Sequence, residues 1–112
     1  MTLFRLLLIA LFLGVVGYTI PVLMEHGFNL FPVFFGDIGK MAWPGQFNVD
    51  FMGFLTLAGV WVMWRNHFAP TSIPLGILAF LGGIPFLTAY LLILSFQPGA
   101  DMKTIMLGRQ RA

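Results

Sequence analysis

The sequence predicts an all-α membrane protein with three transmembrane helices, and three observations point to that fold class. Of the 112 residues, 59% are apolar and only 9% are charged, whereas soluble domains carry about 25% charged residues. Three apolar stretches are each long enough to cross about 30 Å of hydrocarbon as a helix of about 20 residues. No stretch shows the polar–apolar alternation of a barrel strand, so helices are the remaining way to bond every backbone group in lipid. Residues 1–112 are therefore treated as one integral membrane domain.

The first helix is expected at about residues 3–24, because the chain carries no charge between Arg5 and Glu25. Its apolar core is longer than that of a signal peptide and no small-residue cleavage site follows it, which favours a membrane anchor. Along one stripe of this helix lie small residues, whose spacing lets helices approach closely in lipid. They are Ala10, Gly14 and Gly17.

The second and third helices are expected at about residues 46–64 and 73–96. Asn48 and Asp50 are the strongly polar side chains near the start of the second helix. A short connection containing Pro70 separates the two helices, which predicts an antiparallel hairpin.

Proline and small residues also mark the third helix. Pro85 lacks the backbone N–H of a helical residue and is expected to kink the helix. Gly76, Ala79 and Gly83 form a second stripe of small residues. We expect close contacts of the first and third helices through Gly14 and Gly83, either within the chain or with a partner.

The connection at residues 25–45 is long and rich in aromatic side chains, which gain free energy by leaving water. It is expected to lie along the lipid interface, with a short helix or a re-entrant turn, and to fold back so that Glu25 or His26 approaches Asp50. The tail, residues 97–112, is expected to be an exposed and partly ordered end.

Three crossings would place the 25–45 connection and the tail on one face of the membrane, with Arg5, Arg65 and His67 on the other. Arg65 ends the second helix and is expected to extend its charge to the interface as an anchor. The arginines that flank the first two helices favour a cytoplasmic amino terminus, although the tail holds three of the six lysines and arginines and opposes that orientation.

Three titratable residues form the candidate functional cluster: Glu25, His26 and Asp50. A carboxylate inside a membrane helix needs water, a hydrogen-bond donor or a cation nearby. Asp50 is therefore the strongest single candidate for a functional residue. Glu25 and His26 are adjacent in sequence and are therefore expected to point apart on a helix. Solvation of Asp50 among lipid headgroups, with no functional role, is the alternative.

Metal, cofactor and nucleic-acid chemistry find no support in the sequence. There is no cysteine, the spacing of the two histidines matches no zinc pattern, and His26 and His67 are expected at opposite membrane faces. No phosphate-binding loop or nucleophile motif is present. The formal net charge of +2 is too small to argue for nucleic acid. No metal site and no cofactor are predicted.

The sequence contains the motifs Pro21, Glu25-His26-Gly27, Phe34-Phe35, Asp50, Trp64-Arg65, Gly82-Gly83-Ile84-Pro85-Phe86 and Tyr90-Leu91. Their combination resembles a family of short bacterial three-helix membrane proteins that is known only as a domain of unknown function. The resemblance covers about residues 18–92 and implies a multi-pass protein of the bacterial inner membrane, with a basic second loop in the cytoplasm. It implies no reaction.

Three functional hypotheses follow. The leading one is a non-enzymatic accessory or packing subunit of a larger membrane assembly, whose partners are the lipid bilayer and other membrane subunits or further copies of itself. The second is a small oligomeric transporter or carrier in which Asp50 lines the path. The third is an interfacial protein or enzyme that binds a lipid or another lipophile through Glu25, His26 and Asp50.

Overall fold

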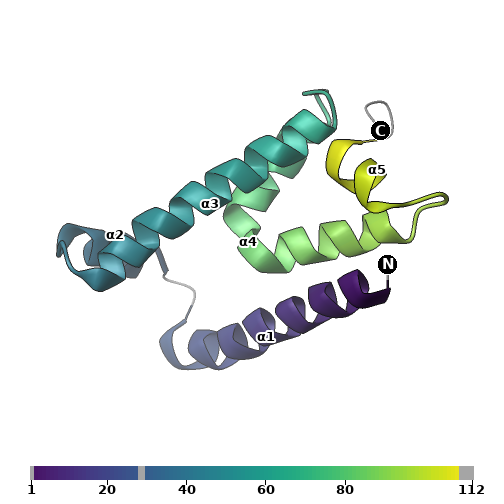
Figure 1. Cartoon of the computed structure of the whole chain (residues 1–112). Helices are drawn as coiled ribbons and strands as arrows, with labels where there is room; N and C mark the ends of the chain where they lie inside the picture. The colour runs from purple at the N-terminus through teal and green to yellow at the C-terminus, as the bar shows by residue number, and fades with distance from the viewer. Residues whose placement is uncertain (1, 28–29, 109–112) are drawn as a thin grey trace.

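The computed structural model describes residues 2–27 and 30–108, and five helices lie in those ranges (Figure 1). Among the described residues there is no strand, and three helices are long and apolar enough to cross a membrane. The all-helical class with three such helices is therefore confirmed. The helices are α1 (Thr2–His26), α2 (Leu30–Gly39), α3 (Trp43–Arg65), α4 (Ser72–Ser95) and α5 (Met102–Leu107).

Helix α1 packs with its first half against the second half of α4. Leu8 is buried there, and the Arg5 guanidinium donates through Nε to the Ser95 hydroxyl at 3.1 Å and through Nη2 to the Ser95 carbonyl at 2.6 Å. Farther along α1, a Cβ built at Gly14 or Gly17 meets nothing within 4 Å. The expected contact of Gly14 with the third helix is therefore not made within the described chain.

Helix α2 forms from the middle of the 25–45 connection and packs against the beginning of α3. Gly45 lies so close to α2 that a Cβ there would collide with the backbone of Asp37 and Ile38. One turn further on, the Asn48 amide donates to the Phe34 carbonyl at 3.0 Å. These pairs run in opposite chain directions, so α2 and α3 form a tight antiparallel hairpin, and α3 begins at Trp43 rather than near residue 46.

Helix α4 is bent at Gly83 into two arms, residues 72–82 and 84–95. Gly83 has φ 62° and ψ −144°, a conformation that is accessible essentially to glycine alone. Pro85 follows and cannot donate the backbone hydrogen bond that a straight helix needs. The expected kink is therefore present, but its pivot is the glycine.

Both arms of α4 run beside α3, in opposite directions. In the first arm, Gly76 meets Gly59 of α3 backbone to backbone, and a Cβ on Gly59 would lie 2.8 Å from the Gly76 carbonyl oxygen. In the second arm, the Tyr90 hydroxyl accepts a hydrogen bond of 3.0 Å from Asn66, next to the end of α3. Both ends of α4 thus lie at the carboxyl end of α3 (Figure 1).

This fold-back places the tail differently from the sequence-based expectation. We use "the Arg65 end" for the start of α1, the carboxyl end of α3, both ends of α4, and α5. Leu8 of α1, Leu91 and Leu94 of α4 and Ile105 of α5 form a buried cluster there. The expectation that the tail shares a face with the 25–45 connection is wrong for its described residues, because a bent α4 returns the chain to the side from which it came.

Candidate functional site

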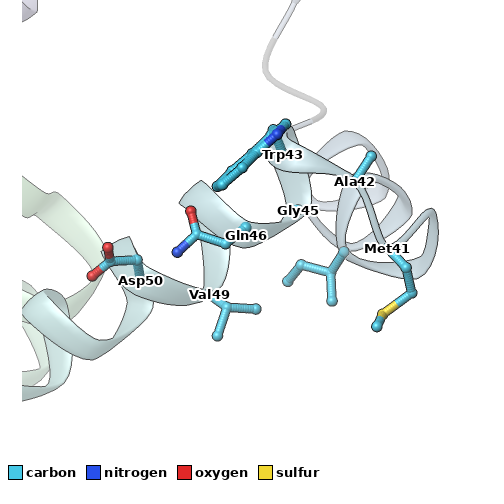
Figure 2. A pocket seen from close by; sticks show the side chains of 8 residues that line it. Met41, Ala42, Trp43, Gly45, Gln46, Val49 and Asp50 are labelled. Atoms are coloured by element: carbon cyan, nitrogen blue, oxygen red, sulfur yellow. The ribbon is translucent and has the colours of Figure 1, made fainter.

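Asp50 lies about two helical turns after Trp43 at the start of α3, and its side chain is exposed. It lines a cavity of about 770 Å³ beside the α2–α3 turn, together with Trp43 and Gln46. Figure 2 shows the carboxylate at the edge of this cavity, one turn beyond Gln46. Among the described residues, Asp50 has no hydrogen bond or ion pair.

Glu25 and His26 lie at the end of α1 and pair with each other instead of with Asp50. His26 Nε2 is 4.0 Å from a Glu25 carboxylate oxygen, and the two side chains are 74% and 79% exposed. The expectation that these adjacent residues point apart is therefore wrong: they are the last two residues of α1, and their exposed side chains bend toward each other. Neither residue lines the Asp50 cavity, so the three members of the candidate cluster are not brought together.

Arg65 makes the densest set of polar contacts in the described chain, at the opposite end of α3. Its Nε donates to the Ile105 carbonyl at 2.6 Å, and its Nη2 donates to the Thr104 carbonyl at 3.2 Å. The last carbonyls of a helix have no partner within that helix and carry partial negative charge. Arg65 therefore holds the carboxyl end of α5, a contact that the expected role as an interfacial anchor did not include.

Hydrogen bonds hold helix α5 at both ends. At its start, the Asp101 carboxylate accepts from the Thr104 N–H at 2.8 Å, while the Thr104 hydroxyl accepts from the Asp101 N–H at 2.9 Å. At its end, the Trp61 indole donates to the Met106 carbonyl at 3.0 Å. The reciprocal cap and the hydrogen bonds from Trp61 and Arg65 together order α5, which is too short to be a stable helix alone.

The cap also sets the pH response of α5. The hydrogen bond from the Thr104 backbone, followed by that from its side chain, holds the pKa of Asp101 below its ordinary value of 3.8. A lowered folded-state pKa means that this cap stabilises the fold above the ordinary pKa and is lost as the pH falls through the folded value. The cap is therefore fully formed at neutral pH.

Arg65 and Tyr90 lie side by side and line a second cavity, of about 440 Å³, which lies between the two arms of α4. Arg65 Nη1 is 3.3 Å from the Tyr90 hydroxyl, and the guanidinium carbon is 5.9 Å from the centre of the tyrosine ring. No aspartate or glutamate lines this cavity. The sequence analysis did not predict this arrangement, because Arg65 and Tyr90 are 25 residues apart and no motif links them.

We expect Arg65→Met to release α5 while leaving the long helices folded. The change removes two charge-assisted hydrogen bonds, which contribute roughly 2 kcal/mol to docking, so the undocked population should rise roughly thirtyfold. Tryptic cleavage after Lys103, an exposed residue of α5, measures that population in the detergent-purified chain. Arg5→Met is the matched control, because Arg5 bonds Ser95 and not α5. Parent-like cleavage of the Arg65 variant would show that other contacts hold α5.

Metal-ligating side chains do not gather in the described ranges. No three histidine, aspartate or glutamate side chains there are placed to hold one ion. Within the described ranges, the cavities at Asp50 and at Arg65 are two places where polar side chains meet an open volume.

Together, the fold and these two cavities define a class: a small all-helical protein with three helices long and apolar enough to span a membrane. Comparison with known protein families, curated proteins and solved structures gives no match to this chain. The resemblance to short bacterial three-helix membrane proteins therefore stays a prediction.

Proposed function

We propose that the chain is a non-enzymatic subunit of a larger assembly in the bacterial inner membrane, where α1 packs against a helix of another membrane subunit. The observation that carries this proposal is the contrast between its two stripes of small residues. Gly76 and Ala79 are buried within the fold, whereas Ala10, Gly14 and Gly17 are exposed, with open space at both glycines.

The second half of α1 supports the same proposal. Arg5 and Leu8 near its start are packed, but Tyr18 and Met24 are 78% and 82% exposed. Because lipid is as apolar as a leucine side chain, helices associate in membranes through close packing of small residues and not through the hydrophobic effect. A stripe that is unused within the chain is therefore a suitable contact for a partner helix.

Charge favours an orientation with the amino terminus in the cytoplasm. Among the described residues, Arg5, Arg65 and Lys103 belong to the Arg65 end, while Lys40 lies in the turn at the other end. Cytoplasmic segments carry the excess of lysine and arginine. On this proposal the fold-back of α4 removes the conflict that the tail created in the sequence, since the described tail then counts with Arg5 and Arg65.

The test is gentle purification of the full chain from its native membrane, followed by mass spectrometry of bound subunits. A fixed partner should accompany the parent and the Gly53→Leu variant but should be lost from Gly14→Leu. The two glycines are matched, because each is exposed on a long helix with nothing within 4 Å of a built Cβ. Retention of the partner by Gly14→Leu, or a parent chain that purifies alone, would contradict the proposal.

An oligomeric carrier is the second candidate, and the unpaired Asp50 favours it. A carboxylate about two turns inside a candidate span is costly unless it faces water or a cation, and an aqueous path between copies would provide both. The same purification distinguishes the two candidates, since a carrier would appear as a closed homo-oligomer with no foreign subunit.

A further inference from the structure

The cavity between the arms of α4 at the Arg65 end has the size and chemistry of a small-ligand site. Its volume of about 440 Å³ lies within the usual range for ligand pockets, roughly 300–1,000 Å³. Polar side chains from four parts of the chain line it: Arg65 at the end of α3, Asn66 and His67 after α3, Tyr90 in the second arm, and Gln97 after α4. It is distinct from the exposed stripe of α1 and independent of the proposed assembly role.

The charge of this cavity is positive and is not balanced by a neighbouring acid. Each hydrogen bond of the half-buried Arg65 side chain goes to a neutral acceptor: the carbonyls of residues 104 and 105, the Asn66 amide oxygen and the Tyr90 hydroxyl. The nearest acid of the described tail, Asp101, is committed to the cap of α5. A partly buried cation without a counter-charge attracts an anion into the cavity.

Several donors remain available to such an anion. The Tyr90 hydroxyl accepts from Asn66 at 3.0 Å and from Arg65 at 3.3 Å, so its own hydrogen is not used within the described chain. Nη2 of Arg65 has two N–H groups, of which one reaches Thr104. The side chains of His67 and Gln97 make no hydrogen bond in the described ranges. Together these groups can surround one tetrahedral anion.

The backbone that carries His67 is held in a costly conformation. His67 and Phe68 have φ of 59° and 52°, and a left-handed residue other than glycine costs roughly 1–2 kcal/mol. Hydrogen bonds from their N–H groups to the carbonyls of Trp64 and Met63, at 3.0 and 2.8 Å, fix this turn. A strained backbone conformation persists only where the surrounding structure imposes it. Here the strained turn carries His67, whose side chain lines the cavity.

We propose that this cavity binds the phosphate group of an anionic phospholipid. Phosphate offers the acceptor oxygens that arginine and hydroxyl donors favour, and arginine is well suited to phosphate because of its planar set of N–H groups. The depth fits a lipid headgroup, because Arg65 ends a candidate span and Trp61 and Tyr90 are the aromatic side chains typical of the interface. Free phosphate in solution shares this chemistry and is the other source.

The test measures lipid retained by the purified full chain in mild detergent, by native mass spectrometry after addition of dioleoyl phosphatidylglycerol or dioleoyl phosphatidylcholine. The parent should retain phosphatidylglycerol in clear preference. Tyr90→Phe keeps the ring but removes the hydroxyl, and should weaken that retention about tenfold. Gln97→Ala should weaken phosphatidylglycerol retention roughly fivefold. This effect would not come from a disturbed fold, because the Gln97 side chain makes no hydrogen bond to the described residues.

Lys103→Gln is the control, since it removes a positive charge from the same end without touching the cavity. It should leave the preference within about twofold of the parent. A separate titration with inorganic phosphate identifies the source: saturable binding lost in Tyr90→Phe, without lipid preference, supports a phosphate site filled from solution. Equal retention of both lipids together with no phosphate binding, or Tyr90→Phe and Gln97→Ala both behaving like the parent, would overturn the proposal.

Discussion

Gly59→Leu should separate α3 from the first arm of α4 and destabilise the chain by about 3 kcal/mol, the upper end of the usual cost of overpacking. The reason is that a Cβ at position 59 meets backbone and not a movable side chain: the Gly76 carbonyl oxygen would lie 2.8 Å away. Neither helix can relieve this contact by a rotamer change. Unfolding in mixed detergent micelles, followed by tryptophan fluorescence, measures the loss.

Gly53→Leu is the matched control, because it makes the same change on the same helix where a Cβ meets nothing within 4 Å. Its stability should stay within about 0.5 kcal/mol of the parent. If the two variants unfolded together, the contact between Gly59 and Gly76 would not hold these helices, and α4 would have to be stabilised through its second arm alone.

Single-cysteine labelling should place both connections of α4 on the same side of the membrane. The chain has no cysteine, so Thr71→Cys before α4, Lys103→Cys after it and Lys40→Cys in the α2–α3 turn give unambiguous signals. Each of these positions is exposed. A membrane-impermeant maleimide should label the first two from one side and Lys40→Cys from the other, an all-or-none difference.

The physical reason is the length of the arms. Residues 72–82 and 84–95 each span about 16–18 Å as helix, which is well short of about 30 Å of hydrocarbon. A straight α4 would cross the bilayer and move Lys103→Cys to the side of Lys40→Cys. That labelling pattern would show that the bend at Gly83 is absent in the membrane.

The helices were predictable because a membrane span is set by length and apolar composition, and both can be read from sequence. The pivot of α4 was less accessible: Pro85 predicts a kink, but a kink angle depends on the conformation of Gly83 and on which neighbours receive each arm. Because the fold-back was not foreseen, the sequence analysis assigned the tail and the carboxyl end of α3 to opposite faces of the membrane.

The candidate site was harder to predict because it depends on partners distant in sequence. Arg65 meets carbonyls of residues 104 and 105, and a carbonyl leaves no mark in the amino-acid sequence. The cap of α5 did leave one, since Asp101 and Thr104 have the spacing of a capping motif. The approach of Glu25 or His26 to Asp50 was expected from their common need for polar partners, but Glu25 and His26 contact each other at the end of α1 and do not line the cavity beside Asp50.

The bend in α4 has a consequence for how the chain enters a membrane. A hairpin whose two arms enter and leave on one side requires no charged group of the described tail, such as Asp101 or Lys103, to pass through hydrocarbon. On the proposed orientation, the part of the chain that has to be translocated runs from the end of α1 to the start of α3, and its charged side chains are Glu25, Asp37 and Lys40. Lysine and arginine retain a segment in the cytoplasm, whereas acids have little effect. This segment has one lysine, Lys40, against Arg5, Arg65 and Lys103 at the Arg65 end, so on the proposed orientation the less basic end of the molecule is the one that crosses.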